Sequence, residues 1–341
     1  MRQMMRHIRT VFLCCLCFSL VGLSFSINPA FSQAKFTYST QFPANHAHTK
    51  VTNEWGKEIE KRTNGKVQIT VFPSGTLTPP DQCYDGLLRG LSDFGMATFG
   101  YSRGRFPLSE VIDLPLGYKS GLGATRLINR FYDKFKPKEF DGVKPLYFHA
   151  HGPGLIHTKK PAYKLEDLTG MKIRCGGLIT KTVKALGAVP VSMPQSEAYD
   201  ALSRGIVDGS IAPYEALFGW KYGELVKFST ECWGAGYSSG FIVAMNKNKW
   251  NALSPDIQKI IEQVSEEFID KTGNAWDQMD KEGKDFAIKL GNKIISLSDS
   301  ENARWAKAVR PVLDEYVKYA QGKNLPGDEA LKFCLEEMKK P

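Results

Sequence analysis

The sequence lacks several patterns that would assign it to a familiar class. No run of lysine and arginine of the kind that binds nucleic acid is present, although the formal net charge of the 341 residues is +9. The phosphate-loop pattern GxxxxGK[ST] is absent, and Gly121-Leu-Gly123 lacks a third glycine. We therefore expect neither a nucleic-acid partner nor a phosphate loop.

Long apolar runs are also missing, apart from one near the N-terminus. Three arginines precede the run VFLCCLCFSLVGLSF, and residues 32–34 (Ser-Gln-Ala) form a small-x-small cleavage site. The run is shorter than the ~20 residues that a membrane-spanning helix needs, so this layout predicts a secretory signal peptide over residues 1–34. We expect an exported, periplasmic protein that begins near Lys35.

Cysteine is scarce once this leader is removed. Four of the seven cysteines remain, and no CxxC motif is left among Cys83, Cys175, Cys232 and Cys334. In an oxidising compartment these four allow three complete pairings, and the sequence does not choose among them. Cleavage also removes three arginines and no acid, so the net charge falls from +9 to +6 (9 − 3), a modest excess that suits an anionic ligand.

The order of strand and helix patterns indicates an α/β protein. A strand over 36–42 leads to a helix that stops at Asn64-Gly65, and a second strand covers 66–72. Ten residues from Tyr84 match ten residues from Tyr199 at six positions, and each copy predicts a helix, a C-terminal glycine and a strand. We expect two similar lobes, each with a mixed, mostly parallel sheet, and a hinge and cleft between them.

The same patterns predict the lobe boundaries. The first lobe is expected to contain 35–151 plus 238–280, and the second lobe 152–237 plus 281–341. A helical period from Pro255 to about residue 290 predicts one long helix, in which Gly273 and Gly283 permit a bend. Other expected helices cover 79–89, 122–135, 214–226, 299–320 and 328–339, and other expected strands cover 144–151, 238–245 and 293–297.

Arg174 lies near the end of the predicted strand MKIRC, which a pair of glycines follows. The glycines allow a sharp bend, so the guanidinium can point beyond the sheet, where its planar fork matches a carboxylate. Open α/β sheets bind ligands beyond the carboxyl ends of their strands, and pockets favour domain interfaces. The other candidate ligand-binding residues of this cleft are aromatic or histidine side chains: Phe42, His46, Tyr101, His151, Tyr214, Trp220 and Tyr237.

Two HxH pairs, at residues 46–48 and 149–151, support a different hypothesis. Residues i and i+2 of a strand share a face, so His149 and His151 could ligate zinc in a secreted metal-dependent hydrolase. No further Asp, Glu or His cluster at ligand-like spacing follows, and we therefore expect no metal, no cofactor and no catalysis. A ligand-sensing domain with the same cleft and a signalling partner is a second alternative.

Four segments resemble, in order and spacing, the signature of TRAP-transporter extracytoplasmic solute receptors, the DctP-type substrate-binding proteins. They are Leu168-Thr-Gly-Met-Lys-Ile-Arg174, Gly187-Ala-Val-Pro190, Glu197-Ala-Tyr-Asp-Ala-Leu202 and Gly205-Ile-Val-Asp-Gly209. The resemblance extends from about Lys35 to the C-terminus. It implies the fold of periplasmic binding proteins with a long helix across both lobes. It also implies capture of a small organic acid and its delivery to TRAP membrane permease subunits, and we expect a monomer.

The resemblance aligns the carboxylate-binding arginine of this family with Arg174. Several members use a second arginine at the position of Gly154, and Ala212 replaces a frequent asparagine. Both departures remove polar groups from the expected ligand site, which includes Ala212. The loss of a cation argues against a dicarboxylate or a sialic acid. The aromatic candidates favour a monocarboxylate with an aromatic or keto-acid body.

Overall fold

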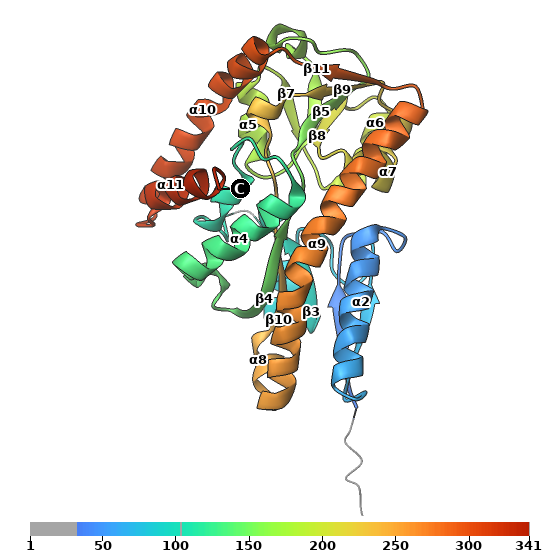
Figure 1. Ribbon diagram of the computed structural model, residues 1–341, viewed down its shortest axis with the longest axis vertical. Helices are drawn as coiled ribbons and strands as arrows, with labels where there is room; N and C mark the ends of the chain where they lie inside the picture. The colour runs from blue at the N-terminus through green and yellow to red at the C-terminus, as the bar shows by residue number, and fades with distance from the viewer. Residues whose placement is uncertain (1–32, 103, 341) are drawn as a thin grey trace, which may run out of the picture. The chain divides into compact units, whose positions relative to one another are not determined.

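The computed structural model describes residues 33–102 and 104–340. They form two β-sheets with helices on their flanks, and Figure 1 shows each sheet in its own lobe. The first sheet has the strand order β2-β1-β3-β10-β4. Its strands are β1 (Ala34–Ser39), β2 (Val67–Phe72), β3 (Phe94–Thr98), β4 (Val143–Ala150) and β10 (Gly240–Asn246).

The second sheet has the strand order β11-β9-β5-β8-β6-β7. Its strands are β5 (Leu155–Thr158), β6 (Lys172–Cys175), β7 (Val189–Ser192), β8 (Gly209–Ala212), β9 (Phe228–Glu231) and β11 (Lys293–Ser296). The α-helices are α2 (Ala47–Arg62), α3 (Cys83–Arg89), α4 (Gly121–Phe135), α5 (Ile179–Ala185), α6 (Ala198–Ser203), α7 (Glu215–Gly219), α8 (Lys247–Asn251), α9 (Pro255–Lys289), α10 (Asp299–Gln321) and α11 (Gly327–Glu337).

One strand in each sheet runs against the others. In the first sheet β10 is antiparallel to both of its neighbours, β3 and β4, whereas β1 is parallel to β2 and β3. In the second sheet β5 is antiparallel to β8 and β9, and the remaining pairs are parallel. The expected pair of mixed, mostly parallel sheets is confirmed.

The ten-residue repeat has the same structure in both lobes. Helices α3 and α6 are each followed by a glycine with left-handed φ, 74° at Gly90 and 70° at Gly205, and then by β3 or β8. The equivalent aspartates Asp93 and Asp208 each accept a backbone N–H from the neighbouring strand, and both N···O distances are 2.8 Å. The matching glycines and aspartates therefore have the same backbone conformation and the same type of hydrogen bond in the two lobes.

Helix α9 is the long helix that the apolar period predicts, and it is unbroken over 35 residues. At 1.5 Å per residue it is about 52 Å long, and Figure 1 shows it passing beside both sheets. Its glycines provide close contacts instead of a bend. A Cβ atom at Gly273 would lie 2.9 Å from Cα of Leu122, and one at Gly283 would lie 2.0 Å from the carbonyl oxygen of Tyr214.

One turn of α9 holds helix N-termini on both lobes. The carboxylate of Asp277 accepts the backbone N–H groups of Gly121 and Leu122 in α4, at 2.6 and 3.2 Å. Asp280 accepts the backbone N–H of Glu215, the first residue of α7, at 2.8 Å. Because these N–H groups have no partner inside their own helices, the two carboxylates fix α4 and α7 to α9.

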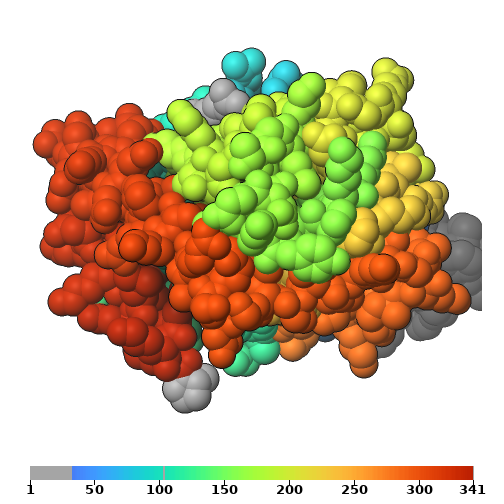
Figure 2. All heavy atoms as spheres, turned by 90° about the horizontal axis from the view of Figure 1, so that it is seen from above, coloured from blue at the N-terminus to red at the C-terminus, as the bar shows by residue number. Residues whose placement is uncertain are grey.

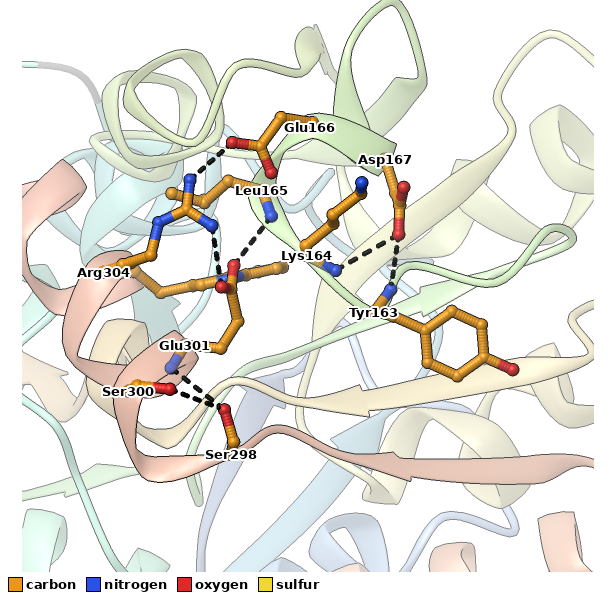
Figure 3. Close-up of polar contacts among 10 residues, drawn as sticks. Tyr163, Lys164, Leu165, Glu166, Asp167, Ser298, Ser300, Glu301 and Arg304 are labelled. Carbon is orange, nitrogen blue, oxygen red and sulfur yellow. Dashed lines mark hydrogen bonds and ion pairs between the residues drawn. The ribbon is translucent and has the colours of Figure 1, made fainter.

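The N-terminal end of α10 is fixed to the second lobe, as Figure 3 shows. Glu301 accepts hydrogen bonds from the backbone N–H of Leu165 at 3.0 Å and from Nη1 of Arg304 at 2.8 Å. Arg304 also pairs with Glu166 of the same loop. In the view from above, the second lobe (green to yellow) and α10 with α11 (red) form much of the visible surface (Figure 2).

Further along, α10 passes from one core to the other. Val309 packs in the core of the second lobe, whereas Leu313 and Tyr316 pack in a core with residues of the first lobe. The Tyr316 hydroxyl donates to the carbonyl oxygen of Leu108 at 2.7 Å. Pro311 lies inside the helix at this transition. Helix α10 therefore contacts both lobes, and the sequence-based lobe boundaries remain a prediction.

Two predicted helices and one predicted strand differ from the structure by more than two residues in their bounds. The strand expected over 36–42 is β1, which ends at Ser39. The helix expected over 214–226 is only the short α7, because Lys221 adopts a left-handed φ of 60° and a single 3-10 turn follows over Tyr222–Glu224. The helix expected to start at residue 79 begins at Cys83, after two prolines and a turn. In both helices a local backbone turn replaces residues that the apolar spacing alone would include in the helix.

The four cysteines after the leader are buried, and none of them is bonded to another within the described residues. Burial raises the pKa of the Cys175 thiol to about 11, so it stays protonated at neutral pH. Among residues 33–102 and 104–340, no helix has the length and apolarity needed to cross a membrane. The predicted signal peptide lies outside the described residues except for its last two positions.

Candidate ligand-binding site

A cavity lies where the carboxyl ends of strands from both sheets meet. Gln41, Gly100 and His151 line it from just beyond the first sheet, after β1, β3 and β4. Gly176 and Pro213 line it from the second sheet, directly after β6 and β8. This is the edge at which open α/β sheets bind ligands.

Six of the predicted site residues line this cavity. They are Phe42, Tyr101, His151, Arg174, Trp220 and Tyr237. Three others lie outside it. The Tyr214 hydroxyl donates to Glu231 at 3.0 Å, the carbonyl oxygen of Ala212 pairs with His157 at 3.1 Å, and the His46 ring stacks on Phe42 behind the cavity wall, with 4.5 Å between ring centroids.

Arg174 is almost completely buried, with 4% of its surface exposed. Its Nε donates to the carbonyl oxygen of Met193 at 3.1 Å, and Nη2 donates to the same oxygen at 2.8 Å and to the Tyr101 hydroxyl at 3.2 Å. Nη1 donates to the side-chain oxygen of Gln195. A guanidinium has five N–H groups, so four have protein acceptors and one on Nη1 remains.

All of these acceptors are neutral. Within the described part of the chain, no carboxylate forms an ion pair with Arg174. A buried charge without a counter-ion is costly, and removal of that cost favours binding of an anion. The Tyr101 hydroxyl also accepts the backbone N–H of Gln195 at 2.9 Å, so its own hydrogen is available as a second donor beside Arg174.

The Tyr237 ring lies against Gly154, the position that the resemblance aligns with a second arginine of some family members. A Cβ atom at Gly154 would lie 2.0 Å from Cε1 of the Tyr237 ring, so no side chain fits there without displacing that ring. Gly154 and Tyr237 also form an isolated antiparallel bridge between the two chain segments that cross from lobe to lobe, with an N···O distance of 2.8 Å.

The histidine at the cavity is neutral. Burial lowers the pKa of His151 to about 4, although its bond to the Gly152 carbonyl raises that pKa, and the Arg174 charge lowers it further. Nδ1 lies 2.5 Å from the Gly152 oxygen and therefore carries the proton. His151 presents an aromatic, uncharged surface to a ligand.

The remaining histidines of the HxH pairs lie in ring contacts of the first lobe. The His48 and His149 rings stack with centroids 5.4 Å apart, and Trp276 Nε1 donates to His149 Nδ1 at 3.1 Å. Burial lowers the pKa of His149 to about 3. Among the described residues, no group of three or more His, Cys, Asp or Glu side chains is placed to hold a metal ion.

Several cavity residues were missed by sequence reasoning. Gln41 and Thr98 could have been found, because each lies at the carboxyl end of a predicted strand. Trp276 is part of an apolar helical period, which predicts a core residue equally well. The other missed residues include Gln195, Glu215, Ser239 and Phe241, which have no local motif in the sequence.

Solved structures of similar proteins share this architecture. A TRAP periplasmic solute-binding protein from Desulfovibrio salexigens is 32% identical, with a TM-score of 0.80 and coverage of 90% of this chain and 96% of that chain. A TRAP solute-binding protein from Rhodoferax ferrireducens, in complex with copurified benzoate, is 28% identical, with a TM-score of 0.86 and coverage of 90% and 98%. A marine metagenome TRAP solute-binding protein specific for aromatic acid ligands, in complex with 3-hydroxybenzoate, is also 28% identical, with a TM-score of 0.86 and coverage of 90% of this chain and 98% of that chain.

Curated relatives and a family model agree with these structures. The C4-dicarboxylate-binding periplasmic protein of Rhodobacter capsulatus is 29% identical over 268 residues, which are 75% of this chain and 78% of the relative. The model of the bacterial extracellular solute-binding protein family 7, the DctP family, matches residues 38–319. The chain therefore belongs to the family 7 extracellular solute-binding proteins, the solute receptors of TRAP transporters.

Proposed function

We propose that this solute receptor acts in the periplasm, where it binds an aromatic monocarboxylate and delivers it to a membrane permease. The observation that carries the proposal is the buried Arg174, a cation without a carboxylate partner in a cavity with aromatic walls. The ligand carboxylate pairs with the remaining N–H of Arg174 and with the Tyr101 hydroxyl. Its ring packs among Phe42, Trp220 and Phe241.

Two further observations support this ligand class. Two proteins that are 28% identical to this chain hold benzoate and 3-hydroxybenzoate, which are aromatic monocarboxylates. The Tyr237 ring fills the space at Gly154, so the cavity has no second cation from that position. A dicarboxylate would leave one carboxylate without a cationic partner. The dicarboxylate-binding relative makes succinate the necessary comparison ligand.

Binding is coupled to the closing of the two lobes. Tyr101 belongs to the first lobe, and its hydroxyl accepts hydrogen bonds from Arg174 and Gln195 of the second lobe. A ligand that contacts both groups makes its full set of contacts only when the lobes meet, so binding shifts the population toward the closed form. The permease can then distinguish loaded from empty receptor by shape.

A thermal-shift screen of residues 35–341 tests the proposal. The ligands are benzoate, mandelate, phenylpyruvate, pyruvate and succinate, each with and without EDTA. A ligand at one hundred times its Kd adds about 2.7 kcal/mol of stability, which is visible as a rise in Tm. We expect a rise with benzoate or mandelate that EDTA does not change. A rise with succinate or pyruvate alone, or destabilisation by EDTA with no response to any acid, would contradict the proposal.

A further inference from the structure

Glu215 is an acidic side chain in the wall of a cavity whose main charge is a buried arginine. It has 3% of its surface exposed, and it lines the cavity together with Arg174. The two groups do not form an ion pair with each other in the described part of the chain. A carboxylate at this place needs an explanation, because the ligand itself is an anion.

His46 donates a hydrogen bond to Glu215. The backbone N–H of His48 donates to Nδ1 of His46 at 3.2 Å, as the N-cap of α2, so Nδ1 is an acceptor without a proton. The proton of the neutral ring is therefore on Nε2, which lies 2.6 Å from Oε1 of Glu215. The ring therefore donates through Nε2, and Oε1 of Glu215 accepts.

The second oxygen of Glu215 remains available. Among the described residues, Oε2 has no hydrogen-bond partner. The surrounding protein does not enclose this oxygen completely, so a small part of its surface is accessible. Gly219 makes room for the carboxylate, because a Cβ atom there would lie 2.4 Å from Oε1. Glu215 lines this cavity and also a second pocket, which His46, Lys50 and Glu224 line. The wall of the Arg174 cavity therefore contains a cation that lacks an anion and a carboxyl group whose Oε2 lacks a donor.

We propose that Glu215, positioned by His46, determines specificity by accepting a hydrogen bond from a hydroxyl group of the ligand and by repelling a second carboxylate. The inference rests on the proposed function and narrows it to a hydroxylated aromatic monocarboxylate. A charged acceptor left without a donor in a desolvated site disfavours the analogue without the hydroxyl. Like charges across the cavity disfavour a dicarboxylate.

Matched ligand pairs that differ by one hydroxyl group test this proposal. The pairs are benzoate with 3-hydroxybenzoate, benzoate with 4-hydroxybenzoate, and phenylacetate with mandelate; isophthalate is the dicarboxylate. Affinities are measured by calorimetry for the wild type, Glu215→Ala and Glu215→Gln, with Glu224→Gln as a control on a partly exposed carboxylate outside the cavity. The readout is the affinity ratio within each pair, which a general loss of fold would not change selectively.

We expect at least one hydroxylated ligand to bind the wild type roughly 10- to 100-fold more tightly than its partner, the range of a hydrogen bond to a charged group. Glu215→Ala should bring that ratio near one, and Glu215→Gln should lower it and improve isophthalate binding. Unchanged ratios in both variants, with benzoate still bound, would overturn this inference alone. No binding of any aromatic acid to the wild type would instead overturn the proposed function.

Discussion

At the scale of single residues, Glu110 links the stability of the fold to pH. It is 6% exposed, and burial together with the nearby Glu139 raises its pKa to about 7, although Lys181 and Lys323 lower it. A raised pKa means that the folded state keeps a proton that the unfolded state releases. The stabilising contribution is therefore complete below pH ~4.5 and is lost as the pH rises to about 7.

Glu110→Gln should consequently stabilise the protein only above this range. The neutral amide resembles the protonated acid, so we expect a gain in the free energy of unfolding on the order of 3 kcal/mol at pH 8 and little change at pH 4. Urea unfolding at both pH values measures the difference. Glu329→Gln, an exposed position on α11, is the control. An equal effect of Glu110→Gln at both pH values would show that its protonation plays no part.

Gly154→Ala tests whether the Tyr237 ring excludes a side chain from that position. The added Cβ would meet the ring at 2.0 Å, so we expect a loss of roughly 1–3 kcal/mol from overpacking. Gly56→Ala is the control, since its Cβ would meet Ile69 at an ordinary 3.5 Å inside helix α2. It should be neutral or stabilising by about 0.5–1 kcal/mol. Equal effects of both variants, measured by urea unfolding, would refute the steric argument.

Individual site residues could be predicted only where a strand end or a motif marked them. Arg174 lines the cavity because a strand and two glycines place it there, and this was visible in the sequence. His46 was predicted from its type, but its ring contacts Glu215 from behind the wall, a pairing across 169 positions of the chain. Contacts of that sequence separation follow from the packing of the lobes and have no local signal.

At the scale of elements, the caps held by α9 organise the helices around the cavity. Asp277→Ala would remove the acceptor for the backbone N–H groups of Gly121 and Leu122. Loss of a helix cap typically costs about 0.5–2 kcal/mol, and we expect a loss in that range by urea unfolding. Asp285→Ala, at an exposed position of the same helix, should change stability much less. Similar losses for both would argue that helix propensity is responsible instead.

Most elements were predictable because their ends have physical signals. Helix α9 starts at Ser254-Pro255, and helix α2 ends before Asn64 and Gly65, which both have positive φ. Prediction failed after Gly219, where apolar and aromatic residues continue while Lys221 adopts the left-handed conformation. A non-glycine residue in that conformation is set by tertiary contacts, which the local sequence does not show.

At the scale of the whole molecule, the lobes touch through glycine backbones beside the cavity. A Cβ atom at Gly177 of the second lobe would lie 2.6 Å from Cα of Gly100 of the first. Gly177→Ala should therefore hinder closure and weaken ligand binding by roughly 5- to 150-fold, the equivalent of about 1–3 kcal/mol of overpacking. Calorimetry with the ligand from the thermal-shift screen measures this loss.

The control for this variant is Gly187→Ala. Both glycines have positive φ, 53° at Gly177 and 87° at Gly187, so both substitutions strain the backbone. A Cβ atom at Gly187 meets nothing within 4 Å, so this variant should lose stability without losing affinity. Equal affinity losses in the two variants would mean that backbone strain, and not the contact between lobes, controls binding.

The most direct test is calorimetric titration of benzoate and of succinate into the wild type and Arg174→Ala, with Arg304→Ala as a surface control in the same lobe. We predict that benzoate binds the wild type and the control equally, and that Arg174→Ala weakens binding by on the order of 2–5 kcal/mol, because the ligand carboxylate loses its only buried cation among the cavity residues. Succinate should give no measurable heat. Unchanged benzoate affinity in Arg174→Ala, or tight succinate binding without benzoate binding, would contradict the central claim.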